Sequence, residues 1–307
     1  MRILLAGTPD VAIPIFEAVA KSSIDIVGVI TNPPKSKGRS GKPIPSPVSQ
    51  WVLQRSLPLF ERGDIEEFRS ELAKIDLVLV VAYGRLIPRE LLDLPRFGWL
   101  NVHFSLLPEA RGAAPVQRLI ASGAHEIGFT LFRLDEGMDT GPIYYQSESI
   151  KISEKTSGQV LAELSALTAG RIVTLLEEVV SGKKPVAQAQ YEGRIPFAPK
   201  ISSEEARINW SLTSREILQR IRAFNPAPSA WTHFRGERFI IHSAHHVEEL
   251  SDGRQDPGKI IVTPKQIMVV TGGGKLSLKE VQPFGKRSMP ALDWARGVAF
   301  TGNETFE

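Results

Sequence analysis

The chain begins with RILLAGTPD (residues 2–10), a short apolar run that ends in a Gly-Thr-Pro-Asp turn. Such a run predicts a buried β-strand. Thr8 is expected to cap a following helix, with Pro9 at its first position and its end near Ala20. Residues 25–30 form a second apolar run and predict the next strand. This strand–helix–strand order is typical of the start of an α/β fold.

Strand-like and helix-like segments continue to alternate through the first half of the chain. Residues 76–82 and 99–103 predict two further strands, and residues 47–55 and 65–74 predict helices. Residues 157–180 carry apolar side chains every three or four positions and predict a long amphipathic helix. Because strands without polar alternation are covered on both faces, the pattern predicts a doubly wound, mostly parallel sheet.

The pattern changes after this helix. Residues 183–202 contain three prolines and little periodicity, which indicates a linker. After a helix over residues 214–223, short strand-like runs predict a small β-barrel; they are residues 230–234, 238–242, 259–262, 267–270 and 275–278. We therefore expect a domain over residues 1–185, a linker over 186–207 and a second domain over 208–307.

Composition narrows the class of protein. The 307 residues include no cysteine, which excludes disulfides, thiolate metal sites and cysteine nucleophiles. The net charge is only +3, but residues 206–307 hold 14 basic and 10 acidic residues. That excess is either chance or a surface for a polyanion. The N-terminal apolar run is too short for a signal peptide, and no run of about 18 apolar residues predicts a membrane span. A cytoplasmic location is expected.

Several common site motifs are absent. The turn at residues 7–10 lacks the GxGxxG spacing of a dinucleotide site, and neither Gly-Lys pair has the spacing of a phosphate-binding loop. The zinc motif HExxH and the nucleophile motif GxSxG do not occur either. Three histidines crowd together in HSAHH (residues 242–246), but their spacing fits a strand or loop better than a metal site. No metal is expected.

Asn101 and His103 are the polar residues that stand out. They lie two positions apart at the end of an apolar strand, so their side chains point to the same side, where ligands bind in open α/β sheets. The alternative is that they merely end the strand. Asp139 follows 36 residues after His103, in a loop with Gly137 and Gly141. That loop either holds backbone close to a ligand or forms an ordinary hairpin turn.

Three stretches of the chain resemble the active site of the N10-formyltetrahydrofolate-dependent formyltransferases. They are NVHFSLLP (101–108), RGAAPVQ (111–117) and LDEGMDTG (134–141). Further stretches narrow the resemblance to the methionyl-tRNA formyltransferase family: AGTPD (6–10), PSPV (45–48), VVAYGRLIP (80–88), SSEEARINWS (202–211) and IRAFNPAPSAW (221–231). The matches extend from residue 5 to about residue 290, and the last two stretches are the most specific.

This resemblance implies a Rossmann-like catalytic domain joined to an OB-like β-barrel that binds tRNA. It implies transfer of the formyl group of 10-formyltetrahydrofolate to the α-amine of methionyl-initiator tRNA, in translation initiation. Asn101, His103 and Asp139 would be the catalytic residues. The amine would attack directly, through a tetrahedral oxyanion and without an acyl-enzyme.

The resemblance also assigns binding residues. The folate co-substrate would lie beside Ser105, Leu106, Leu107 and Pro108, and beside Arg85, Leu86 and Ile87. Residues 32–43 contain four basic residues, Lys35, Lys37, Arg39 and Lys42, and would enter the acceptor end of the tRNA. By composition alone, a solvated loop is the favoured interpretation of this segment. The protein is expected to act as a monomer.

The chain departs from the family pattern at three positions. Phe104 follows the histidine where the family often has a small residue, Asn209 replaces a common aspartate, and Ala227 replaces an expected tryptophan. Other formyltransferases, acting on glycinamide ribonucleotide or on amino-sugar nucleotides, share the same three catalytic residue types. A formyltetrahydrofolate hydrolase and a non-catalytic RNA-binding protein are the remaining alternatives.

Overall fold

The computed structural model describes residues 1–36, 41–61, 68–183, 188–190, 197–247 and 256–307. These residues form two units, and each is described by itself. The first consists of residues 1–115, 127–150 and 161–198, and the second of residues 116–126, 151–160 and 199–307.

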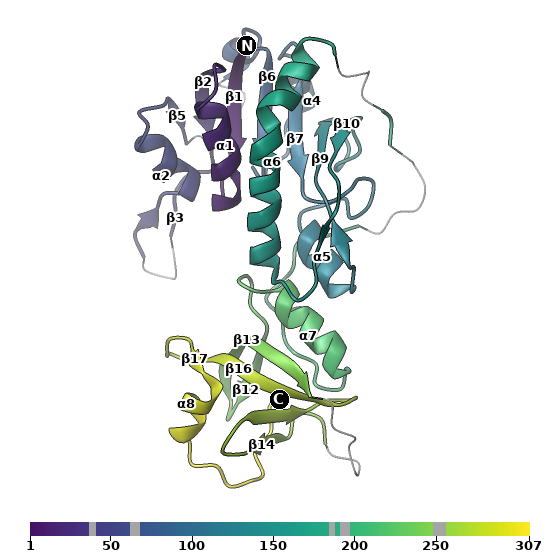
Figure 1. Ribbon diagram of the computed structural model, residues 1–307. Helices are drawn as coiled ribbons and strands as arrows, with labels where there is room; N and C mark the ends of the chain where they lie inside the picture. Colours follow the sequence, from purple (N-terminus) through teal and green to yellow (C-terminus); the bar gives the residue numbers. More distant parts are fainter. Residues whose placement is uncertain (37–40, 62–67, 184–187, 191–196, 248–255) are drawn as a thin grey trace. The chain divides into compact units, whose positions relative to one another are not determined.

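A seven-stranded sheet forms the centre of the first unit, in the order β10-β9-β7-β6-β1-β2-β5 (Figure 1). The strands are β1 (Arg2–Gly7), β2 (Asp25–Ile30), β5 (Leu59–Phe60), β6 (Leu77–Val81), β7 (Trp99–His103), β9 (Thr130–Arg133) and β10 (Ile143–Gln146). The first five of these are parallel, whereas β9 and β10 are antiparallel. The prediction of a mostly parallel sheet is confirmed.

Helices cover both faces of this sheet. They are α1 (Ile13–Ala20), α2 (Pro47–Leu53), α3 (Arg69–Leu72), α4 (Arg89–Leu92) and α6 (Ser157–Val180). Every residue of β6 is buried, which requires cover on both sides. One face packs against Phe68, Leu72 and Leu91.

The start of the first helix differs from the prediction. Thr8 caps no helix, and Pro9 precedes a 3-10 turn, η1 (Asp10–Ala12), before α1 begins. The Thr8 hydroxyl is used elsewhere, because it donates to the Tyr83 carbonyl at 3.3 Å and accepts from the Asn32 amide at 2.9 Å. Thr8 therefore joins three loops instead of ending a helix.

The long helix α6 packs through a buried stripe that includes Val160, Leu164, Ile172 and Leu175. The Ser165 hydroxyl donates to the Val11 carbonyl at 2.6 Å. By length and composition α6 is also able to cross a membrane, with 39% of its most apolar window buried. This criterion indicates a membrane span only weakly, since the core helix of a soluble protein meets it too.

The second unit is built on a curled antiparallel sheet, a half-barrel with the order β12-β13-β16-β15-β14 and with β17 paired to β16. The strands are β12 (Trp231–Phe234), β13 (Glu237–Val247), β14 (Ile260–Val262), β15 (Ile267–Val270), β16 (Lys275–Pro283) and β17 (Met289–Pro290). Helices α7 (Ser214–Ala223) and α8 (Ala291–Arg296) belong to the same unit. The expected C-terminal β-structure is confirmed.

Aromatic side chains fill the core of this half-barrel. Phe239 packs against Trp294 and Phe306, with ring centroids 4.6 and 5.1 Å apart. Helix α5 (Pro115–Ala121) belongs to this unit from Val116 onward, and its Arg118 guanidinium pairs with both carboxylate oxygens of Glu205. A chain segment from the first half of the sequence thus helps to build the second unit.

Glu304 links the C-terminal segment of the second unit to Arg235 through hydrogen bonds. Its carboxylate accepts hydrogen bonds from the backbone N–H groups of Thr301 and Gly302, at 2.8 and 3.0 Å, and from Arg235 at 2.9 Å. These donors favour the charged form, and the Thr301 N–H contributes most, so the pKa of Glu304 falls to about 2.

We expect Glu304→Gln to destabilise the second unit in a pH-dependent way. A folded-state pKa below the unfolded value of about 4.3 stabilises the fold above that value, and the effect is lost as the pH falls toward 2. Denaturant unfolding should therefore show a difference between variant and wild type that is largest at pH 7 and shrinks below pH 4.5. Glu237→Gln, an exposed carboxylate on β13, is the control. A difference independent of pH would contradict this account.

Candidate active site

The carboxyl ends of β1, β2, β6 and β7 meet at one edge of the seven-stranded sheet. The strand order reverses between β1 and β6, and such a reversal opens a crevice for ligands in α/β sheets. The loops here are tied together: Asn32 donates to the Tyr83 carbonyl at 2.8 Å and accepts from Arg85 at 2.5 Å. The loop positions at this edge are therefore fixed by hydrogen bonds.

Asn101 and His103 lie at this edge, on the last three residues of β7. His103 is buried, with 5% of its surface exposed, and its ring makes an edge-to-face contact with Phe132 at 6.3 Å. Asn101 is half-buried, and no described residue hydrogen-bonds its side-chain amide. A buried imidazole therefore lies next to an amide that is available to a ligand.

A backbone carbonyl sets the tautomer of His103. The ring Nε2 lies 3.0 Å from the Ala110 carbonyl oxygen, which is only able to accept. In the neutral ring, Nε2 must then carry the hydrogen, and Nδ1 holds the free lone pair. The nitrogen that is able to accept a proton is therefore Nδ1.

Asp139 faces that nitrogen. Its Oδ2 lies 3.7 Å from His103 Nδ1, too far for a direct hydrogen bond but close enough for a strong charge interaction. The same oxygen accepts a 2.8 Å hydrogen bond from the Gly112 backbone N–H. Gly112 has φ +124, and a Cβ there would lie 2.6 Å from the Ala198 carbonyl oxygen, so only glycine fits.

Burial lowers the pKa of His103 below its usual 6.5, whereas the charge of Asp139 and the hydrogen bond to Ala110 raise it. Burial has the larger effect because the imidazole has almost no contact with solvent. His103 is thus neutral at pH 7. The arrangement offers a neutral base, a carboxylate that stabilises its protonated form, and an amide donor from Asn101.

The segment after β7 is held from within. The Ser105 hydroxyl donates to the Glu109 carbonyl at 2.6 Å, and the Leu107 N–H donates to the Thr130 hydroxyl at 3.0 Å. Ser105 and Leu107 are buried, whereas Leu106 and Pro108 are half-buried. Apolar contact with a ligand is therefore open to Leu106 and Pro108. Phe104 is buried too, with 6% exposed, and fills the protein interior.

The loop after β6 carries the other three residues that the sequence assigned to folate. Leu86 is 81% exposed, a large apolar side chain with almost no cover, and Ile87 packs partly against the core of the first unit. Arg85 is exposed and donates to Asn32. The exposed Leu86 offers a contact surface for an apolar ring system.

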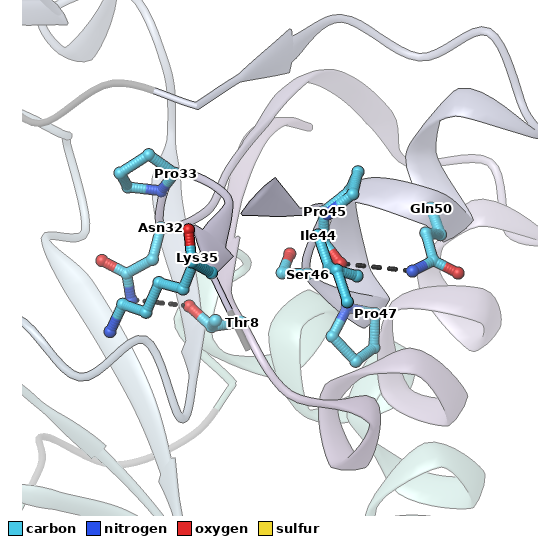
Figure 2. A pocket seen from close by; sticks show the side chains of 10 residues that line it. Thr8, Asn32, Pro33, Lys35, Ile44, Pro45, Ser46, Pro47 and Gln50 are labelled. Carbon is cyan, nitrogen blue, oxygen red and sulfur yellow. Dashed lines mark hydrogen bonds between the residues drawn. The ribbon is translucent and has the colours of Figure 1, made fainter. Parts of the chain in front are cut away.

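The basic segment forms the base of a small hairpin. Strand β3 (Lys35–Ser36) pairs with β4 (Pro43–Ile44), and Lys35 and Lys42 are exposed on it. Lys37 and Arg39 lie outside the described residues. An open pocket of about 380 Å³ borders this hairpin, with Thr8, Asn32 and Lys35 on one side and Ile44, Pro45, Pro47 and Gln50 on the other (Figure 2).

Within the described ranges, no group of three or more metal-ligating side chains occurs. His242 and His246 lie on β13, where they contact Gln282 and Ser214 at 3.1 and 2.8 Å. The histidine cluster belongs to a strand with local hydrogen-bond partners.

Sequence reasoning missed the groups that orient the site. The Ala110 carbonyl fixes His103, and the Gly112 N–H fixes Asp139, but both are backbone groups. Backbone groups carry no side-chain signal, so the sequence does not mark their roles. The only hint was that RGAAP is rich in small residues.

The sequence of this chain is similar to known proteins over both of its halves. Residues 1–175 match the family described as formyl transferase, and residues 200–299 match the formyl transferase C-terminal domain. A methionyl-tRNA formyltransferase from Nocardioides sp. (strain ATCC BAA-499 / JS614) is 39% identical over 303 residues, which cover 97% of this chain and 95% of the relative.

Solved structures share the fold. HypX from Aquifex aeolicus in complex with tetrahydrofolic acid has a TM-score of 0.65 at 17% identity, covering all of this chain and 51% of that one. The methionyl-tRNA formyltransferase from Clostridium thermocellum has a TM-score of 0.58 at 17% identity, covering 89% of this chain and 100% of that one. On the sequence matches to both of its halves, the chain belongs to the formyl transferase family.

Proposed function

We propose that this protein transfers the formyl group of 10-formyltetrahydrofolate to the free α-amine of methionyl-initiator tRNA, and that it does so in the cytoplasm as a monomer. One observation carries the proposal. The Asn101 amide, which no described residue hydrogen-bonds, lies at the sheet edge with a neutral buried imidazole and a carboxylate. The chain is 39% identical along nearly its whole length to a methionyl-tRNA formyltransferase.

The residues at this edge fit a folate. When bound, the folate would supply a formyl group that is already activated by its attachment to N10. Leu106 and Pro108 offer partly exposed apolar surface, and Leu86 offers an uncovered apolar side chain. A flat ring system buries such side chains favourably. Ser105 and Leu107 would support the contact through backbone, as would Arg85 and Ile87 in the neighbouring loop.

Asn101 and His103 would share the chemical work. The Asn101 amide would donate a hydrogen bond to the formyl oxygen as negative charge develops on it, which lowers the barrier to attack. His103 Nδ1 would accept the proton that the attacking amine loses, directly or through one water molecule. It would then give that proton to N10 of the folate as the bond between N10 and the formyl carbon breaks. Asp139, 3.7 Å from that nitrogen, would stabilise the imidazolium that results.

The basic hairpin would bring the tRNA to this edge. Lys35 and Lys42 are exposed on the hairpin base, and Lys37 and Arg39 belong to the same segment of sequence. Their charges would pair with phosphates of the acceptor end. We further propose that residues 1–185 form the formyl-transfer domain, that residues 186–207 are a linker, and that residues 208–307 bind tRNA.

Other acceptors define the alternatives. Glycinamide ribonucleotide and amino-sugar nucleotides are small, and water is the acceptor in a hydrolase. The basic hairpin and the basic C-terminal third favour a polyanion instead. The test is to supply the pure protein with 10-formyltetrahydrofolate and, separately, methionyl-initiator tRNA, each small amine, or buffer alone. We expect formyl-methionyl-tRNA as the main product. Faster transfer to a small amine, or release of formate alone, would reject the proposal.

Single substitutions test the three side chains. We expect Asn101→Ala, His103→Ala and Asp139→Ala each to lower kcat/KM for formyl transfer by on the order of 10² or more, because each removes a group that acts in the transition state. Thermal unfolding should show that the variants fold. His125→Ala, which changes an exposed histidine of the second unit, should keep full activity. Full activity in His103→Ala would end the role proposed for that residue.

The protonation of His103 gives a second, independent test. Because burial lowers its pKa, we expect the imidazole signals of His103 in NMR spectra to titrate below pH 6.5. The Asp139 charge raises that pKa, so Asp139→Asn should move the midpoint to still lower pH. The same titration in His125→Ala should match wild type. A midpoint that rises in Asp139→Asn would contradict the charge interaction.

A further inference from the structure

A buried glutamine reaches the candidate site from the segment that follows α6. Gln190 has 9% of its surface exposed. Two residues earlier, the backbone of Gln188 exchanges two 2.8 Å hydrogen bonds with Ile143 of β10. This bridge brings residues 188–190 to the sheet, next to the loop that contains Asp139.

The side-chain amide of Gln190 makes four hydrogen bonds. Its Nε2 donates to the Asp139 carbonyl at 3.0 Å and to the Gly141 carbonyl at 2.7 Å. Its Oε1 accepts from Arg111 Nε at 3.0 Å and from Nη2 at 2.7 Å. Since carbonyls only accept and a guanidinium only donates, this environment allows one orientation of the amide. Every donor and both lone pairs are used.

These bonds join the two loops that hold the Asp139 carboxylate. Arg111 directly precedes Gly112, whose N–H donates to Asp139 Oδ2. On the other side, Asp139 has φ +53, a conformation that costs energy in a residue with a side chain. A Cβ at Gly141 would lie 1.8 Å from the Arg133 carbonyl oxygen, so this loop is closely packed there. Such a conformation persists only where surrounding contacts enforce it, and Gln190 supplies two of them.

We propose that Gln190 is a positioning residue for formyl transfer, which clamps the loops of Arg111 and Asp139 together and so holds the Asp139 carboxylate against His103. The inference rests on the proposed function, because it presupposes that Asp139 and His103 act in formyl transfer. Glutamine suits the place because one end must donate to two carbonyls while the other accepts from a guanidinium. A glutamate would keep the second interaction and place an oxygen against both carbonyls.

Gln190→Ala and Gln190→Glu should each lower kcat for formyl transfer by roughly tenfold to a hundredfold, since a displacement of about 1 Å is enough for such a loss. The KM for methionyl-tRNA should stay within about twofold, because Gln190 itself would touch no substrate. Gln188→Ala is the matched control: it removes an exposed side chain from the same segment and keeps its backbone bridge. It should behave as wild type.

A double-mutant cycle separates positioning from general support of the fold. If Gln190 acts through Asp139, then Gln190→Ala should cost little further activity in the Asp139→Ala background. If it only supports the fold, the same loss should appear in both backgrounds, which would overturn the proposal. Gln190→Glu keeps the size and the Arg111 interaction, and so serves where Gln190→Ala does not fold.

The NMR titration of His103 tests, without any enzymatic turnover, whether Gln190 holds the Asp139 loop in place. Release of the Asp139 loop should move the midpoint in the same direction as Asp139→Asn does, and Gln188→Ala should leave it unchanged. A wild-type protein that forms no formyl-methionyl-tRNA would reject the proposed function, yet the titration would still report on the clamp. Wild-type titration together with wild-type kcat in both Gln190 variants would overturn the clamp itself.

Discussion

The hydrogen bond between His103 Nε2 and the Ala110 carbonyl determines what this site is able to do. It fixes the hydrogen on one ring nitrogen and leaves the lone pair of the other facing Asp139. Without it, the charge of Asp139 would favour the hydrogen on Nδ1, and that nitrogen would then have no lone pair to accept a proton from the amine. The carbonyl, and not the aspartate, thus orients the imidazole. Asp139 is left to stabilise the positive charge.

The fold brings the Ala110 carbonyl and the His103 ring together. The parallel strands end at one edge, where β7 delivers Asn101 and His103. The chain then turns back within seven residues to place the Ala110 carbonyl beside the ring Nε2. The hydrogen bonds of Ser105 to Glu109 and of Leu107 to Thr130 hold this turn in place. Within SLLP, Ser105 and Leu107 thus shape the backbone, whereas Leu106 and Pro108 keep partly exposed side chains.

Much of this was predictable, and the physical reason differs from case to case. Apolar runs such as residues 76–82 predicted the parallel strands because burial on both faces leaves a simple pattern. The spacing of Asn101 and His103 predicted that they share one side of a strand. The prediction for Thr8 was wrong, since its hydroxyl bonds to Tyr83 and Asn32, which are distant in sequence. Local pattern rules contain no information about partners of that kind.

The role of Gln190 could not be predicted from the sequence either, because its hydrogen-bond partners are also distant along the chain. Gln190 lies in a segment whose prolines and missing periodicity indicate only a linker, and its partners are a guanidinium and two backbone carbonyls. No motif joins those groups. The segment is nevertheless well placed to order the site, because the bridge between Gln188 and Ile143 holds it against β10, beside the Asp139 loop.

The lowered pKa of His103 suits a base in this reaction. An α-amino group has a pKa of about 7.7 to 8.0, so a weaker base removes little of its proton before attack. As the amine attacks, however, its nitrogen gains positive charge and its N–H groups become strongly acidic. A neutral imidazole is then basic enough, and burial keeps it neutral until that moment. The Asp139 charge offsets part of the cost of burying the imidazolium that follows. At 3.7 Å the carboxylate makes no direct hydrogen bond to Nδ1, so it acts on the imidazolium through its charge.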